Sequence, residues 1–254
     1  MTQPYGKLID FHSHILPNMD DGSSSVEMSL QMIQMAFQQG VYAIVLTPHF
    51  YPAKDYPEHF LKKRSRLLNE LNAQRPFPVP LLILGAEIQY FEGLTSMKEL
   101  PQMRIQKSPG LLIEMPFRTW TGRMIDDLLE LNHRSEYRVI LAHIERYLDN
   151  QKESTICKLV EEGIMMQSNA SFFTGAFSKR KALRMLADGR IHLLGSDCHN
   201  MTSRPPNLKK ACSVITKKQG SDAVKNVMNC GFQLLLEEAR NESFSYSTNE
   251  EFVL

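Results

Sequence analysis

Histidines and carboxylates stand at the ends of several apolar runs in this chain. The first run lies within Ile9-Asp10-Phe11-His12-Ser13-His14, and four later runs lead into His49, Glu87, His143 and Asp197, with His199 two residues further on. An ionisable group is costly to bury unless it is paired or bound to a metal. Imidazole nitrogens and carboxylate oxygens are common ligands of divalent metals. The pattern therefore predicts a metalloenzyme.

The apolar runs that carry these residues are typical of buried parallel strands. We predict seven strands, over residues 7–11, 42–47, 81–86, 111–115, 138–142, 164–168 and 191–196. Amphipathic segments predict helices over residues 26–39, 57–75, 122–133, 154–162, 179–188, 206–218 and 221–239. This alternation predicts βαβ units with right-handed crossovers. In a barrel built from such units, the predicted ligands lie together at the carboxyl-terminal mouth of the strands.

Further carboxylates extend the candidate ligand set. Glu114 falls within predicted strand 111–115, where its charge needs a cation or, as the alternative, an arginine partner. Asp20 and Asp21 precede a glycine, where an aspartate commonly stabilises a turn or a helix N-terminus, but their nearness to His14 makes one of them a candidate ligand. Four carboxylates and five imidazoles are enough for two or three divalent cations. The positive charge of such a centre suits an anionic substrate such as a phosphate ester.

Length and composition agree with one α/β barrel, for which roughly 250 residues is typical. The 254-residue chain has a formal net charge of +1, which gives no electrostatic support for binding nucleic acid or inserting at a membrane. We find no signal-peptide pattern and no apolar stretch near the roughly 20 residues of a membrane span. Four scattered cysteines favour a cytoplasmic protein with reduced thiols. We expect a single domain over residues 1–254, with a loosely held tail after about residue 241.

Several separated motifs resemble, in order and spacing, those of the polymerase and histidinol phosphatase (PHP) superfamily. They are His12-Ser13-His14, Thr47-Pro48-His49, Gly85-Ala86-Glu87, Ala142-His143 and Ser196-Asp197-Cys198-His199. Longer stretches are similar to the bacterial CpsB/YwqE-type protein-tyrosine phosphatases: residues 9–17 with 20–23, 112–117, 143–147, and 195–200 with Arg204-Pro205-Pro206. The resemblance runs from about residue 8 to about residue 236. It departs at Ile144, where the family usually has proline, in the loop that aims Arg146.

This resemblance implies a distorted (β/α)7 TIM-like barrel with the metal site at the carboxyl-terminal mouth. Carried over motif by motif, the metal ligands are His12, His14, Asp21, His49, Glu87, Glu114, His143, Asp197 and His199. Glu87 would bridge two of two or three divalent cations, commonly manganese in the family, with iron or zinc as alternatives. The family's phosphate-binding arginines match Arg146 and Arg204, and a guanidinium fork suits bidentate binding of phosphate oxygens.

The activity that the resemblance implies is that of a phosphoric monoester hydrolase. It is a metal-dependent protein-tyrosine phosphatase in which a metal-bridging hydroxide attacks phosphorus. The implied partner is a phosphotyrosine protein, the tail of a bacterial tyrosine kinase that regulates capsule or exopolysaccharide synthesis. The sequence identifies neither the general acid for the leaving group nor the oligomeric state.

Other functions remain open at this point. One is a small-molecule phosphomonoesterase of the histidinol-phosphatase type, and another is a non-catalytic regulatory module, which would need a degraded ligand set. Cys198 and Arg204 also have the Cys-x5-Arg spacing of thiolate phosphatases, but the loop between them contains no glycine. Amidohydrolases share the initial His-x-His motif, although bimetallic members often use a bridging lysine carbamate where Glu87 stands.

Overall fold

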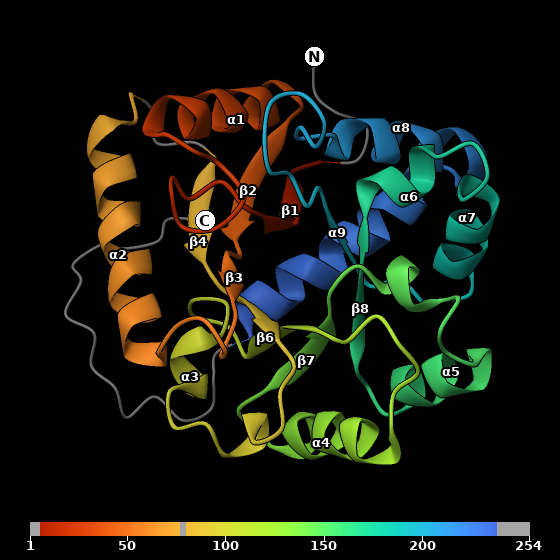
Figure 1. Cartoon of the computed structure of the whole chain (residues 1–254). Helices are drawn as coiled ribbons and strands as arrows, with labels where there is room; N and C mark the ends of the chain where they lie inside the picture. Colours follow the sequence, from red (N-terminus) through yellow and green to blue (C-terminus); the bar gives the residue numbers. More distant parts are fainter. Residues whose placement is uncertain (1–5, 77–79, 238–254) are drawn as a thin grey trace.

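The computed structural model describes residues 6–76 and 80–237 of the chain (Figure 1). Its strands pair in parallel throughout this part of the chain. They are β1 (Leu8–Ser13), β2 (Val41–Leu46), β3 (His49–Phe50), β4 (Leu81–Leu84), β5 (Glu87–Gln89), β6 (Gly110–Glu114), β7 (Arg138–Leu141), β8 (Met165–Asn169) and β9 (Leu193–Gly195). One set has the order β1-β2-β4, and the other has the order β3-β5-β6-β7-β8-β9.

The two sets of strands form one curled sheet, because β3 continues β2 and β5 continues β4. Backbone hydrogen bonds carry the pairing across both breaks: Gly85 N–H donates to Leu46 O at 2.8 Å, and Glu87 N–H donates to Pro48 O at 3.0 Å. His49 and Glu87 are the first residues after these breaks. The sheet therefore has seven strand positions in the described residues, as the sequence predicts.

Hydrogen bonds at the carboxyl ends of β1 and β9 join the first strand to the last. Asp197 N–H donates to His12 O at 2.7 Å, and His14 N–H donates to Cys198 O at 2.9 Å. The approach is close enough to require glycine at position 195, since a Cβ there would lie 2.5 Å from the Cβ of His12. The predicted distorted barrel of seven parallel strands is confirmed. Its first and last strands are joined beside the predicted metal ligands.

Helices cover the outside of this sheet (Figure 1). They are α1 (Val26–Gln38), α2 (Pro57–Gln74), α3 (Leu100–Met103), α4 (Gly122–His133), α5 (Glu153–Glu161), α6 (Ala170–Thr174), α7 (Lys179–Ala187), α8 (Leu208–Gln219) and α9 (Ser221–Leu236), with 3₁₀ turns η1 (Leu94–Ser96) and η2 (Ile144–Tyr147). Helix α1 begins where the Ser25 side chain accepts a hydrogen bond from Met28 N–H, and it buries Met32, Ile33 and Ala36 against the strands.

The predicted helices are present with ends that differ by at most two residues from the prediction, apart from the last. Residues 238 and 239, the end of predicted helix 221–239, lie outside the described residues, as does the predicted tail. Helices α3 and α6 and the two 3₁₀ turns were not predicted, since segments of three to five residues are too short for a periodic pattern. Among the described residues, no helix combines the length and the apolar character that crossing a membrane requires.

Candidate metal centre

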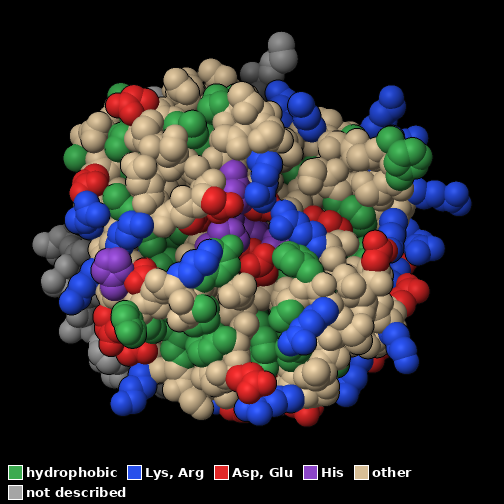
Figure 2. Space-filling view, viewed as in Figure 1, with side chains coloured by type: hydrophobic (Ala, Val, Ile, Leu, Met, Phe, Trp, Pro, Cys, Tyr) green, Lys and Arg blue, Asp and Glu red, His purple; other side chains and the backbone are tan. Residues whose placement is uncertain are grey.

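All nine predicted ligands lie at the carboxyl-terminal mouth of the barrel. They come from the end of β1 and the loop after it, the starts of β3 and β5, the end of β6, and the residues that follow β7 and β9: His12, His14, Asp21, His49, Glu87, Glu114, His143, Asp197 and His199. Figure 2 shows histidine side chains at the floor of a hollow in the centre of this face, with basic and acidic groups around them. Convergence at one mouth is what the strand-end positions predict.

Glu87 lies at the centre of the cluster. Its Oε2 atom is 3.2 Å from Nε2 of His12, 3.3 Å from Nε2 of His14 and 2.9 Å from Nδ1 of His49. Its Oε1 atom is 2.8 Å from Nε2 of His143. The two oxygens of one buried carboxylate therefore face two different sets of imidazoles.

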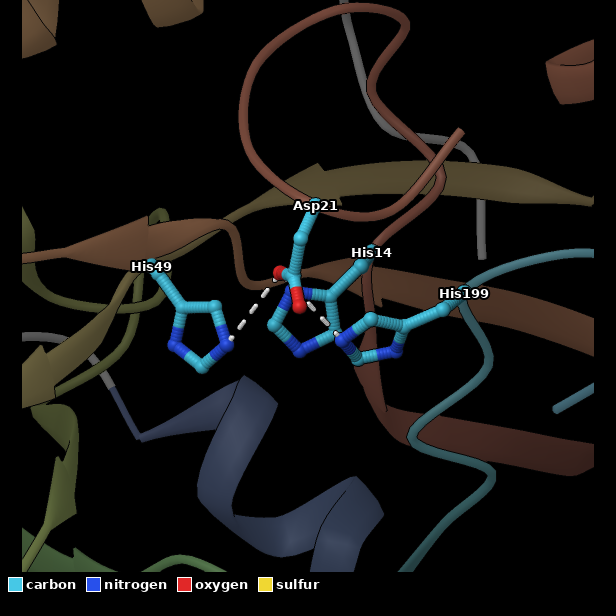
Figure 3. A group of neighbouring side chains, drawn as sticks. All are labelled: His14, Asp21, His49 and His199. Atoms are coloured by element: carbon cyan, nitrogen blue, oxygen red, sulfur yellow. Dashed lines mark ion pairs between the residues drawn. The ribbon is translucent and has the colours of Figure 1, made fainter. Parts of the chain in front are cut away.

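A second group lies closer to solvent (Figure 3). The Asp21 carboxylate reaches between two imidazoles, with Oδ1 3.6 Å from Nε2 of His49 and 3.5 Å from Nε2 of His199. His14 lies behind them, its ring centroid 3.9 Å from that of His199. Asp21 is 68% exposed whereas His14 is fully buried, so this group spans the depth of the mouth.

Several buried atoms of the cluster lack a hydrogen-bond partner. They are Nδ1 of His49, Nδ1 of His143, Oε2 of Glu87 and Nε2 of His199. Nδ1 of His49 and Oε2 of Glu87 are 2.9 Å apart, yet the pair does not have hydrogen-bond geometry. Ligands about 2.0–2.2 Å from a divalent cation lie about 3 Å from one another. The separations and the unpartnered atoms thus fit lone pairs that are shared with cations.

Asp197 divides its two oxygens between the histidines and the arginines. Oδ1 lies 3.7 Å from Nε2 of His12 and 3.4 Å from Nε2 of His14. Oδ2 lies 2.6 Å from Nη2 of Arg146 and 2.6 Å from Nη2 of Arg204. Both predicted phosphate-binding arginines are therefore beside the cluster, and each remains more than a third exposed. Ile144, in the position where the family usually has proline, is fully buried, and the loop still brings Arg146 to this site.

Backbone conformation turns two of these side chains inward. His143 has φ 34° and Asp197 has φ 52°, the left-handed region that non-glycine residues rarely adopt. Such conformations persist where the surrounding structure enforces them, and they are common at functional sites. Each residue lies two positions beyond the end of a strand, where this backbone turn redirects its side chain across the mouth.

Three residues outside the predicted ligand set hydrogen-bond to the cluster from behind. Oδ2 of Asp20 is 2.7 Å from Nδ1 of His14 and also accepts the backbone N–H of His49 at 2.9 Å. Oε1 of Gln167 is 3.0 Å from Nδ1 of His12. Asn169 accepts a hydrogen bond from the Gln167 amide at 3.1 Å and donates one to Oδ2 of Asp197 at 2.8 Å.

The polar sequence at the end of β8 was the available signal for two of these residues. Gln167 and Asn169 alternate on one face of a buried strand, at the same end as the other functional residues. For Asp20 and Asp21, spacing alone left the choice open. The structure places Asp20 behind an imidazole and Asp21 on the open side of the mouth.

The pKa shifts of Glu87 and His143 show that the carboxylates of the cluster attract positive charge. Burial would raise the pKa of Glu87, but the neighbouring imidazoles of His12, His14 and His143 hold it well below its usual range. Burial lowers the pKa of an imidazole, but hydrogen bonds to Glu114 and Glu87 raise that of His143 to about 9. The protonated form of His143 is thus favoured in the protein alone, and a cation bound at this imidazole would displace that proton.

Comparison with known proteins gives consistent results over nearly the whole chain. Residues 8–236 match the family model for capsular polysaccharide synthesis, CpsB/CapC. The chain is 31% identical to tyrosine-protein phosphatase CpsB from Streptococcus pneumoniae, over 87% of this chain and 94% of that protein. It is 30% identical to tyrosine-protein phosphatase YwqE from Bacillus subtilis, over 85% of this chain and 86% of that protein.

The structural comparison agrees. One of the crystal structures of YwqE from Bacillus subtilis and CpsB from Streptococcus pneumoniae, described as unique metal-dependent tyrosine phosphatases, matches with a TM-score of 0.77. The two chains are 28% identical, and the match covers 90% of this chain and 94% of the other. Fold and sequence similarity therefore extend over the barrel and every segment that supplies the cluster.

Proposed function

The chain belongs to the CpsB/CapC family and is a metal-dependent tyrosine-protein phosphatase of the CpsB/YwqE type, and we propose that its nine clustered histidines and carboxylates form the metal site of this activity. The observation that carries the proposal is the environment of Glu87. One of its oxygens lies within 3.3 Å of three imidazole nitrogens and has no hydrogen-bond partner. In this proposal Glu87 would bridge two cations, and the whole site would hold two or three.

Most of the ligands fall into three overlapping groups, each of which could hold one cation. One group is His12, His14 and Glu87, another is His49, Glu87 and Glu114, and the outer group is His14, Asp21, His49 and His199. His143 contacts both Glu87 and Glu114, and Oδ1 of Asp197 faces His12 and His14. When bound, the cations supply positive charge to the phosphate oxygens and acidify the water that attacks phosphorus.

The chain's own residues orient the ligands and the substrate. Asp20 and Gln167 engage Nδ1 of their imidazoles, so that Nε2 of His14 and of His12 keeps its lone pair toward Glu87. Arg146 and Arg204 bind the phosphate through guanidinium N–H groups that Asp197 does not occupy, and their charge stabilises the transition state. The departing phenolate has a pKa of about 10, so it needs less help from a general acid than an alkoxide does.

The same proposal includes the metal, the protein substrate and the cellular location. Nitrogen and oxygen ligands without a thiolate suit manganese, with iron or zinc as alternatives. The substrate is a phosphotyrosine protein, and we propose the tail of a bacterial tyrosine kinase that regulates capsule or exopolysaccharide synthesis. The chain acts as one cytoplasmic domain, without membrane insertion or nucleic-acid binding. The family's role in capsular polysaccharide synthesis supports the choice of substrate.

The experiment that tests this function combines metal analysis with phosphatase assays. The protein as purified, the metal-stripped protein and the manganese-reloaded protein are compared on a phosphotyrosine peptide and on histidinol phosphate. We expect two or three metals per chain, loss of turnover on stripping, recovery on reloading, and a preference for the peptide. Full activity without metal would reject the proposed site, and a preference for histidinol phosphate would replace the substrate.

A further inference from the structure

A phenylalanine is exposed at the mouth, directly beside the candidate metal centre. Phe117 follows Glu114 by three residues in the loop after β6, and it is 53% exposed. Its ring centroid lies 5.8 Å from that of His143 and 5.7 Å from that of Tyr147, onto which it stacks with an interplanar angle of 22°. One face of the phenyl ring is thus supported by the site, and the rest of it is open to solvent.

Aromatic packing below Phe117 fixes this position. Tyr147 is fully buried, its hydroxyl accepts a hydrogen bond from Met115 N–H at 3.0 Å, and the ring of Trp120 packs edge-on against it at 5.1 Å. The indole N–H of Trp120 donates to Pro116 O at 3.1 Å, which closes the loop around Phe117. The phenyl ring therefore stands on a packed aromatic base.

Hydrogen bonds to Gln151 hold the same loop from the side. Its amide N–H donates to Arg118 O at 2.7 Å, and its Oε1 accepts Trp120 N–H at 3.3 Å. Thr119 donates to Asn150 O at 3.2 Å. Phe117 is thus exposed on a loop that these hydrogen bonds hold in place.

A phosphotyrosine substrate brings an aromatic ring to this place. A single oxygen joins the ring to phosphorus, so a phosphate at the cluster leaves the ring at the rim of the mouth. His143 contacts Glu87 at 2.8 Å on one side and Phe117 on the other, which links the phosphate position to the exposed phenyl ring. Another aromatic group beside the cluster, Tyr51, is already engaged by the ring of His49 at 4.8 Å and the ammonium of Lys54 at 4.4 Å.

We propose that Phe117 receives the substrate's phenyl ring and makes this site select aryl phosphates over alkyl phosphates. The inference rests on the proposed function, because that function places the phosphate at the cluster. Aromatic rings gain from offset or edge-to-face packing beyond the burial of their area, which corresponds to about a two- to twelvefold effect on binding. In this proposal Phe117 contacts only the phenyl ring of the substrate. It therefore contributes nothing to binding the phosphate or the metal.

The test compares two non-hydrolysable ligands that differ by the ring, phenylphosphonate and methylphosphonate. Their dissociation constants are measured by calorimetry on manganese-loaded wild type, Phe117→Ala, Phe117→Trp and Phe37→Ala, with bound metal and Tm for each protein. Phe37 is a matched control, since it is 45% exposed in the last turn of α1, at the opposite end of the barrel. We expect Phe117→Ala to weaken phenylphosphonate binding about two- to twelvefold without changing methylphosphonate binding or metal content. Phe117→Trp should keep the wild-type ratio, as should Phe37→Ala.

Two results would overturn the inference. If the ratio of the two constants is the same in Phe117→Ala as in wild type, the ring does not bind there. If both ligands weaken equally in Phe117→Ala, the side chain supports His143 and not the substrate. Hydrolysis of a phosphotyrosine peptide by wild type is measured in parallel and judges the proposed function separately, since the binding ratio does not depend on turnover.

Discussion

The side-chain oxygen of Gln167 lies 3.0 Å from Nδ1 of His12 and accepts the backbone N–H of His143 at 2.7 Å. One amide from β8 thus orients two residues of the cluster that come from β1 and from the end of β7. An acceptor at Nδ1 requires the proton of a neutral His12 to be there, which leaves the lone pair on Nε2, the atom that faces Glu87. Gln167 therefore sets both the tautomer and the direction of a predicted metal ligand.

We predict that Gln167→Ala weakens metal binding while the fold persists. Removing a hydrogen-bond partner of a metal-ligating histidine typically costs about 10- to 100-fold in metal affinity. The control is Gln219→Ala, which removes a half-buried amide that donates to Leu183 O at 2.6 Å, in the helical layer. Metal affinity is measured by competition with a chelator. Equal affinities in both variants would mean that Gln167 does not position His12.

We predict that Glu87→Gln and His143→Ala each lower phosphatase turnover by at least about a hundredfold and reduce bound metal. The amide of glutamine nearly matches the carboxylate in size but lacks the charge and the second acceptor oxygen that lie between the two sets of imidazoles. Turnover and metal content are measured on the same preparations. Near-normal rates with full metal content in both variants would contradict the assignment.

Strand-end position was enough to predict which residues from distant parts of the chain meet at the mouth of the barrel. His49, Glu87, His143 and Asp197 each follow an apolar run, and parallel strands of a barrel end at one mouth. Residues separated by dozens of positions in the sequence therefore meet, as the separation of 2.8 Å between His143 and Glu87 demonstrates. The same reasoning predicted the seven strand positions, because the period and the length of the runs carry that information.

Features that depend on local geometry could not be predicted in the same way. Asp20 and Asp21 are adjacent in a turn, and only the path of the loop decides which one faces His14 from behind. Gln167 and Asn169 are uncharged, so the cost of burying a charge did not draw attention to them. Phe117 follows a buried strand as an ordinary apolar residue, and its exposure depends on the packing of Trp120 and Tyr147 beneath the loop.

We predict that Cys198→Ser retains most of the activity. Cys198 is fully buried on the strand-closing segment beside His14, and burial raises the pKa of its thiol, so it does not supply the thiolate that a cysteine phosphatase needs. Turnover is measured together with resistance of the wild type to iodoacetamide. Loss of turnover in Cys198→Ser with its metals still bound would favour a thiolate mechanism.

The two arginines separate substrate binding from metal assembly. Both contact Oδ2 of Asp197, while Oδ1 of the same carboxylate faces His12 and His14. We therefore predict that Arg146→Ala and Arg204→Ala leave bound metal unchanged, because the oxygen that faces the imidazoles keeps its place. A charge-assisted hydrogen bond contributes roughly 1.5–3 kcal/mol, so each variant should lower kcat/KM by about tenfold to a few hundredfold.

Lysine at the same positions distinguishes geometry from charge. Arg146→Lys and Arg204→Lys should recover only part of kcat/KM, because an ammonium group lacks the planar fork that binds two phosphate oxygens. Inorganic phosphate, the product, should inhibit the alanine variants more weakly than the wild type. Bound metal, kcat/KM and phosphate inhibition are measured on one set of proteins, with Arg66→Ala as the control, since that exposed arginine pairs with Glu70 on α2. If both alanine variants keep wild-type kcat/KM and phosphate inhibition, Arg146 and Arg204 only neutralise Asp197 and do not bind the substrate.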